Sequence, residues 1–271
     1  MATRVKRVRS GGNGLDQSDQ ALYVYAITRG PIKSALALKG VEGATTVEPL
    51  TVGDYTCWIS RVSKTEFADR LQQNMQNLDW LAAASVRHQQ VVSAIAESGD
   101  LLPARFATVF LTEASLKKYV QQHRRRLEAS FARIKGCDEW GVKIHALRRA
   151  PAPQPVANES GKQYLQRKSA SVQTRASRMD ADVEEIARAL EAISRESTPG
   201  GSMSRGQPGL MWQRSFLIPR RNRRQLETLL AKFAERWRET RQVECTGPWP
   251  PYSFVSAGGQ ESLPEQAESL S

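Results

Sequence analysis

The sequence predicts an α+β protein with two domains, each a mostly antiparallel sheet with helices packed on it. Short apolar runs rich in β-formers, such as Ala21–Ile27, alternate with longer amphipathic stretches. Two segments rich in Pro, Gly or Ser, residues 148–157 and 197–209, interrupt the second half of the chain. A length of 271 residues, of which 40% are hydrophobic, suffices for one large or two modest cores.

The first half begins as a central strand would. Ala21–Ile27 is almost entirely apolar, as in a strand that is buried on both faces. Further strands are expected at 55–62, 47–50 and 102–110. From about Thr65 to Gly99, apolar residues recur every three or four positions, which predicts a long helix with a possible break near Asn77. Thr112 is suited to cap a second helix that Gly136 closes, so the first domain is expected to span residues 20–136.

The second half, residues 137–256, has the element order of a modified ferredoxin-like layer, with helices on one face of an antiparallel sheet. The expected elements are strand 140–147, helix 158–195, strand 210–218, helix 222–240, strand 243–246 and a short strand 252–256. Segments 148–157 and 197–209 are expected to be flexible. The basic residues 1–19 and the acidic residues 257–271 are expected to be disordered tails.

Charge and composition restrict the class of protein. A formal net charge of +11 favours polyanion binding, so a basic nucleic-acid-associated protein is the alternative interpretation. The basic clusters are scattered, however, and neither zinc-finger spacing nor an RNP-type aromatic strand is present. No apolar run is long enough to span a membrane, and the basic N-terminus lacks the apolar core of a signal peptide. Three distant cysteines without a C-x-x-C pair indicate free thiols in a reducing cytosol.

A catalytic constellation is not apparent. His88, His123 and His145 are separated, and the first two lie on or beside apolar helical stripes. The sequence contains no H-E-x-x-H, no P-loop and no G-x-S-x-G motif. We therefore expect no metal, no cofactor and no enzymatic activity, and a protein that acts through protein–protein interactions.

The most distinctive stretch is Thr246–Val255, which reads Thr-Gly-Pro-Trp-Pro-Pro-Tyr-Ser-Phe-Val. Proline holds φ at about −65° and has no N–H, so its three prolines impose a rigid, non-helical path into the expected last strand. Three other blocks precede it: Leu-Leu-Pro-Ala-Arg-Phe-Ala-Thr-Val-Phe at 101–110, Glu-Trp-Gly-Val-Lys-Ile at 139–144 and Ser-Gly-Lys-Gln-Tyr-Leu at 160–165. In this order, the four blocks resemble the GvpF/GvpL family of gas vesicle accessory proteins, over about residues 21–256.

The resemblance implies a function. Proteins of this family are required to form gas vesicles, hollow organelles whose wall is built from a small, very hydrophobic subunit. It implies a cytoplasmic accessory or minor structural protein of the gas vesicle that binds this shell subunit, and other accessory proteins, and assists nucleation and assembly. No small-molecule substrate is implied. The residues expected to contact partners or to carry the family motifs are Arg105, Phe106, Trp140, Trp249, Pro250, Pro251, Tyr252 and Phe254.

The Arg105 block departs from the family pattern, which usually reads Leu-Pro-Leu-Arg-Phe-Gly-Thr. Ala104 and Ala107 replace the Leu and the Gly. If that Gly served a close backbone approach, Ala107 would disturb it, whereas Ala would fit a small core gap. Arg105, on an expected apolar strand, would need an acceptor, either within an ion pair or on a bound anion or partner.

Overall fold

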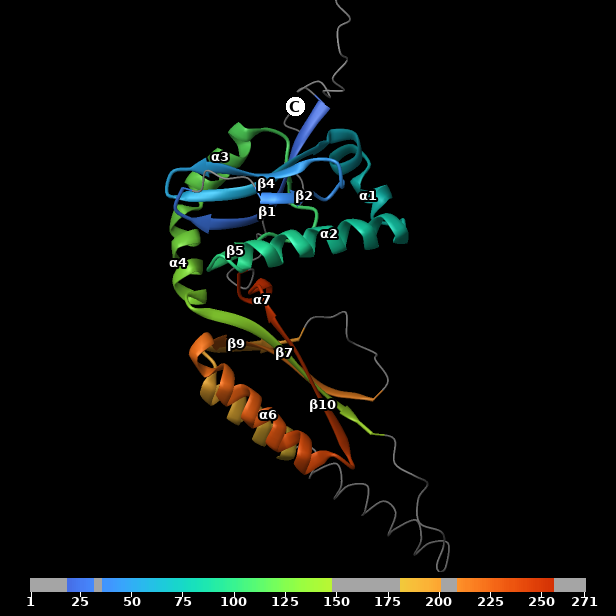
Figure 1. The fold of residues 1–271 in the computed structure, drawn as a ribbon, viewed down its shortest axis with the longest axis vertical. Helices are drawn as coiled ribbons and strands as arrows, with labels where there is room; N and C mark the ends of the chain where they lie inside the picture. Colours follow the sequence, from blue (N-terminus) through green and yellow to red (C-terminus); the bar gives the residue numbers. More distant parts are fainter. Residues whose placement is uncertain (1–18, 32–35, 148–180, 201–208, 256–271) are drawn as a thin grey trace, which may run out of the picture. The chain divides into compact units, whose positions relative to one another are not determined.

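The computed structural model describes residues 19–31, 36–147, 181–200 and 209–255. They form two compact units, one containing residues up to 95 with 104–124, the other 96–103 with residues from 125 onward (Figure 1). The division expected at Gly136 thus falls inside the second unit. The expected segments 148–157 and 257–271 lie outside the described residues, as does the expected tail 1–19 apart from Asp19.

The first unit is built around an antiparallel sheet. Its strands are β1 (Gln20–Arg29), β2 (Leu36–Lys39), β3 (Thr46–Val52), β4 (Tyr55–Ser63) and β6 (Val109–Phe110), and the same sheet also contains β5 (Leu101–Pro103), whose residues are assigned to the second unit. The strand order is β2-β3-β4-β1-β5, and β6 also pairs with β1. The expected central strand is confirmed, because residues 21–28 of β1 are all buried. The expected strand 102–110 is wrong, because residues 104–108 form a loop between β5 and β6.

Helices border this sheet. They are η2 (Thr65–Asp69), α1 (Leu71–Asn74), α2 (Leu78–Ala96) and α3 (Glu113–Gln122), with α4 (Arg124–Ile134) following in the second unit. The break near Asn77 is confirmed, since its side chain accepts hydrogen bonds from the N–H groups of Asp79 and Trp80 and so starts α2. Thr112 caps α3 as expected, with its Oγ1 3.1 Å from the N of Ser115. The single helix expected to follow Thr112 is interrupted at His123.

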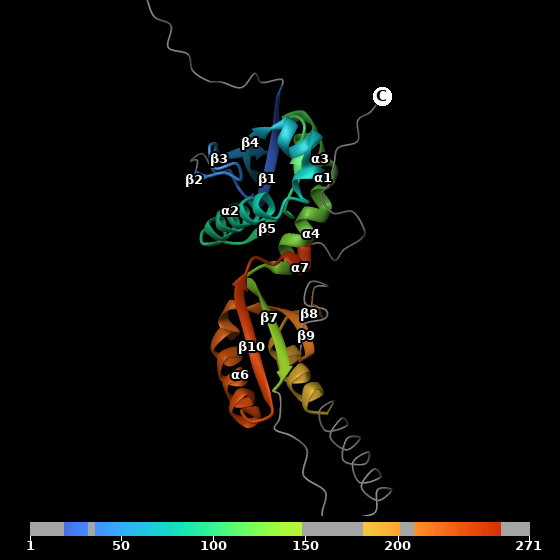
Figure 2. The same ribbon diagram turned by 90° about the vertical axis from the view of Figure 1, so that its right-hand side faces the viewer.

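The second unit has a ferredoxin-like element order, but it differs from the predicted order because the sequence does not predict a strand at 196–199 and because residues 252–255 of the expected last strand are helical. Strands β7 (Cys137–Ala146), β8 (Glu196–Pro199), β9 (Leu210–Pro219) and β10 (Arg241–Trp249) form an antiparallel sheet in the order β10-β7-β9-β8. Residues 181–193 are helical, and η4 (Arg220–Asn222) leads into α6 (Arg223–Trp237). Both helices pack on one face of the sheet (Figure 2). The prediction that residues 197–209 form a flexible connection is wrong for residues 197–199, because they belong to β8, which pairs with β9.

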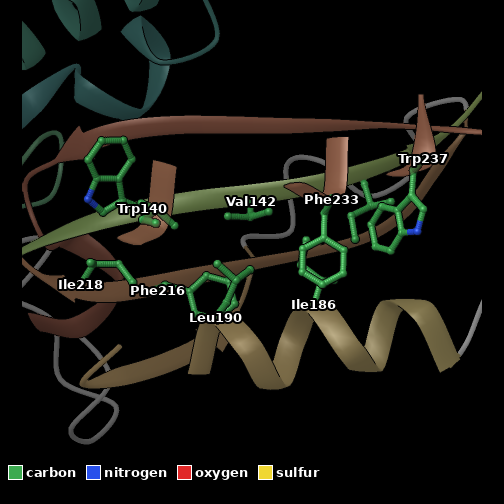
Figure 3. Close-up of a cluster of buried hydrophobic side chains, with 10 residues drawn as sticks. Trp140, Val142, Ile186, Leu190, Phe216, Ile218, Phe233 and Trp237 are labelled. Atoms are coloured by element: carbon green, nitrogen blue, oxygen red, sulfur yellow. The ribbon is translucent and has the colours of Figure 1, made fainter. Parts of the chain in front are cut away.

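The core of the second unit lies between that sheet and its helices. Trp140, Val142, Phe216 and Ile218 extend from the sheet towards Ile186 and Leu190 of the helix 181–193 (Figure 3). Phe233 and Trp237 of α6 extend the same cluster, with ring centroids 5.0 Å apart. Burial of such large apolar side chains stabilises a fold by about 1.5–3 kcal/mol each.

Candidate functional site: an anchored C-terminal motif

The C-terminal motif begins with an irregularity in β10. The pairing of β10 with β7 shifts register between Thr246 and Trp249, and the Gly247–Pro248 peptide bond is cis. Gly247 has φ 138°, which side chains rarely adopt, and a Cβ there would lie 2.9 Å from the carbonyl oxygen of Glu139 and from the ring of Trp140. Glycine is therefore required at this position for both its backbone angle and its lack of a side chain.

The motif ends in a short helix, not in the expected strand. Tyr252–Val255 forms α7, in which Phe254 and Val255 donate their N–H groups to the carbonyl of Pro251. Proline suits the position just before such a turn, because its φ is already helical and its missing N–H would have no partner there. The alternation of Tyr, Ser, Phe and Val thus describes a single helical turn whose Phe254 is fully buried.

A carboxylate from β7 holds α7 in place. Glu139, which is only 7% exposed, accepts hydrogen bonds from the backbone N of Ser253 at 2.9 Å and from its Oγ at 2.5 Å. Burial and the nearby Glu139 charge raise the pKa of Tyr252 above its ordinary range. Glu139 therefore acts as a cap that β7 supplies to a helix distant in sequence.

An arginine from α4 provides a second anchor. The Nη1 of Arg133 donates to the carbonyl oxygen of Phe254 at 2.7 Å, and its guanidinium lies 6.0 Å from the Phe254 ring centroid. The remaining guanidinium nitrogens of Arg133 form a two-pronged ion pair with Glu196 of β8. Hydrogen bonding to Arg133 holds the pKa of Glu196 below its usual range. Side chains from α4, β7 and β8 thus converge on α7.

The structure divides the expected site residues into two groups. Trp140, Pro250, Pro251 and Phe254 are buried and serve packing. Tyr252 is half-buried, whereas Trp249 is 43% exposed at the end of β10. The anchors Glu139, Arg133 and Glu196 received no role from the sequence. Glu139 could have been recognised as a carboxylate on an otherwise apolar strand beside Trp140, but nothing local to Arg133 or Glu196 indicates their pairing.

Loop 104–108 in the first unit corrects one expectation. Arg105 is exposed in a loop, so it is not the buried arginine of an apolar strand. Phe106 is half-buried in an aromatic cluster and lies 5.9 Å from the ring centroid of His88 and 6.3 Å from those of Tyr23 and Trp80. Of the two, only Arg105 is exposed to solvent.

Ala107 explains the glycine that is usual at this position of the family pattern. Its φ is 65°, in the left-handed region that disfavours side chains, and it is buried. Its N–H donates to the Tyr23 hydroxyl at 3.0 Å, and that hydroxyl lies 2.9 Å from Nδ1 of His88. Burial lowers the pKa of His88 to about 4, so its imidazole is neutral and can accept a hydrogen bond from the Tyr23 hydroxyl. The backbone angle, more than space, therefore makes glycine favourable here.

Exposed apolar side chains also occur on α2 and just before it. Leu78 is 78% exposed and Val86 56%, and Met75 lies just before them in the chain. Within the described ranges, no group of three or more His, Cys, Asp or Glu residues could hold a metal ion. No helix among those residues is long and apolar enough to cross a membrane.

Comparison with known proteins agrees with this fold. A family model described as "Gas vesicle synthesis protein GvpL/GvpF" matches residues 21–256. Gas vesicle protein L of Streptomyces sp. (strain CB03234) is 30% identical over 260 residues, covering 90% of this chain and 96% of its own. Gas vesicle protein F2 of Halobacterium salinarum is 25% identical over 241 residues, covering 88% and 93%.

Solved structures show the same fold. The crystal structure of GvpF from Anabaena sp. PCC7120 superposes with a TM-score of 0.67 at 18% identity, covering 89% of this chain and 98% of that one. GvpF from Microcystis aeruginosa superposes with a TM-score of 0.64 at 18% identity, covering 87% and 98%. With the family model matching most of the length, the chain belongs to the GvpL/GvpF family of gas vesicle synthesis proteins.

Proposed function

We propose that this chain is a gas vesicle accessory protein that binds the hydrophobic shell subunit and assists nucleation and assembly of the vesicle in the cytoplasm. Family membership supports the accessory role. A subunit with exposed strand edges and apolar faces would aggregate before it is incorporated, so a protein that covers those surfaces would keep it competent for assembly.

The observation that favours a docking surface is the exposed Trp249 on an edge strand. Strand β10 pairs with β7 on one side, and no strand from the described part of the chain lies on its other side. A partner strand could add there through backbone hydrogen bonds, with Trp249 as an aromatic anchor. The anchors Glu139 and Arg133 order the adjoining α7, which keeps the entropy cost of binding low.

The basic composition does not favour the nucleic-acid alternative. Many cationic side chains are already engaged by carboxylates, including Arg61 with Glu113 and Arg236 with Glu185. Ion pairing therefore neutralises part of the positive charge that the composition alone would offer to a nucleic acid.

The test is retention of purified shell subunit, kept soluble, on the immobilised chain. Trp249→Ala should reduce retention by about tenfold or more, since a hot-spot aromatic contributes about 2 kcal/mol or more. Trp249→Phe keeps an aromatic ring and should lose less. Leu78→Ala, which truncates an exposed apolar side chain on α2, is the matched control and should bind normally.

Two results would contradict the proposal in different ways. If Leu78→Ala abolishes retention and Trp249→Ala does not, the docking surface is α2 and not β10. If the unaltered chain retains no subunit, the proposed binding itself is wrong.

A further inference from the structure

The second unit carries a basic patch around the N-terminal end of β7, defined here as Lys135, Arg195, Arg221 and Arg224. All four side chains are exposed. Other cations nearby are neutralised: Arg220 pairs with Asp100 and Asp138, and Arg223 pairs with Glu227. By contrast, Lys135, Arg221 and Arg224 form no ion pair with any residue in the described ranges.

Backbone and side-chain contacts bring the patch together. The N–H of Arg220 donates to the carbonyl of Gly136 at 3.0 Å, and Asn222 donates to the carbonyl of Ile193 at 2.8 Å. Arg221 is therefore held between the chain segments that carry Lys135 and Arg195. The Nη1 of Arg195 donates to the carbonyls of Arg133 and Lys135 at 2.7 and 2.9 Å, and no carboxylate of the described residues pairs with Arg195.

This concentration of charge does not serve helix stability. Arg223 and Arg224 begin α6, whose first turn contains no acidic residue. Cations at a helix N-terminus oppose the helix dipole, so these residues are unfavourable for α6 in isolation. An anionic group lying over the patch would reverse that cost.

The chain itself supplies a matching segment. Residues 256–271 contain Glu261, Glu265 and Glu268 and no Lys or Arg. They begin directly after α7, which lies close to the basic patch. Arg133 donates to the carbonyl of Phe254 in α7, and Arg195 of the patch donates to the carbonyl of Arg133. An extended chain spans about 3.3–3.6 Å per residue, so Glu261 can reach roughly 20 Å from Val255.

We propose that the acidic residues 256–271 dock on the basic patch of the second unit and shield it from other anionic segments. The contact is an exposed, multivalent ion-pair interaction, so its strength comes from the high effective concentration of a tethered segment and falls with added salt.

The probe is a fluorescent peptide with the sequence of residues 256–271, added to full-length chains at low ionic strength. The full-length variant Glu261→Gln/Glu265→Gln/Glu268→Gln should bind this peptide about three- to tenfold more tightly than the unaltered chain, because its own tail no longer competes. Adding Arg221→Gln/Arg224→Gln to that variant should remove the gain.

A matched control changes the same charge elsewhere in the second unit. Arg188 and Arg238 are exposed and pair with Glu184 and Glu235, respectively, close in sequence. Arg188→Gln/Arg238→Gln should therefore leave peptide binding unchanged. Equal affinity of the unaltered and tail-neutralised chains, no binding to either, or equal losses from the two arginine pairs would each overturn the proposal.

Discussion

Replacing Glu139 is the sharpest test of how the C-terminal motif is held. Its carboxylate is 7% exposed and accepts two hydrogen bonds from Ser253. Hydrogen bonds to a charged group contribute about 1.5–3 kcal/mol each. The gross loss in Glu139→Ala would thus be about 3–6 kcal/mol. Relief of the desolvated carboxylate and access of water to the half-buried Ser253 reduce this, so we expect a net loss of about 2–3 kcal/mol.

A substitution at Ser253 distinguishes the contribution of its hydroxyl from that of its backbone N–H, which both donate to Glu139. Ser253→Ala removes the hydroxyl and keeps the backbone N–H, so it should cost about 1–2 kcal/mol in the unaltered chain. In the Glu139→Ala background the same change should cost almost nothing, because the acceptor is already gone. Glu139→Gln retains one oxygen acceptor and should fall between the unaltered chain and Glu139→Ala.

The assay must report on α7 locally, because a chain with two units need not unfold in one step. Native-state hydrogen exchange of the amides at 253–255 measures the free energy of local opening. Glu244→Ala, a carboxylate change on the neighbouring β10 with a side chain 41% exposed, is the control and should change that free energy by less than about 1 kcal/mol. Unchanged protection in Glu139→Ala, or an equal cost of Ser253→Ala in both backgrounds, would refute the capping role.

Three other predictions follow from buried contacts. Ala107→Val should lower the free energy of unfolding by about 2 kcal/mol or more in denaturant titration, because a β-branched side chain is strained at a φ of 65°. Ala107→Gly should change the free energy of unfolding by less than about 1 kcal/mol, because the loss of the buried methyl group offsets the relief of backbone strain. The pKa of His88 is about 4 in the folded chain against an ordinary 6.5, so the contribution of His88 to the free energy of unfolding is intact above pH 6.5. About 3 kcal/mol of this stability is lost as the pH falls to 4, because the unfolded chain then binds a proton that the folded chain does not. His88→Gln should flatten this pH dependence in unfolding measurements. Arg133→Met should reduce protection of both β8 and α7 in hydrogen exchange, and an effect on α7 alone would contradict the shared anchor.

Local patterns in the sequence predict the regular elements well. The apolar run of β1, the Thr112 cap and the helix start at Asn77 all depend on residues close together in the chain. These features are determined by side-chain periodicity and by hydrogen bonds within a turn. The sequence therefore predicts them without knowledge of the contacts between residues distant in the chain.

The errors occur where partners distant in the chain decide the outcome. Strand β8 reads Glu-Ser-Thr-Pro, a polar edge segment without a hydrophobic pattern, and it is a strand because β9 pairs with it. Tyr252–Val255 is too short for its alternation to distinguish strand from helix, and the buried Phe254 and the Glu139 cap favour the helix. Arg105 comes shortly after the proline that ends β5 and lies in a loop. The conformation of that loop depends on Tyr23 and His88, which are distant in the sequence.

The sequence predicts the site only as a motif and does not predict how its side chains are arranged. The Pro-rich segment identifies which residues matter, but not that Trp249 is exposed while Trp140 and Phe254 are buried. The pairing of Arg133 with Glu196 spans 63 residues, and no local signal encodes it.

The two anchors of α7 have a consequence for biosynthesis. Arg133 and Glu139 are translated long before Ser253 and Phe254, the residues whose groups they bind. Until those last residues leave the ribosome, the growing chain carries an uncapped carboxylate and an incompletely bound guanidinium beside the newly formed sheet. The second unit can therefore form both anchoring contacts only after residues 253 and 254 have been synthesised, and a chain truncated before Ser253 would lack both of them.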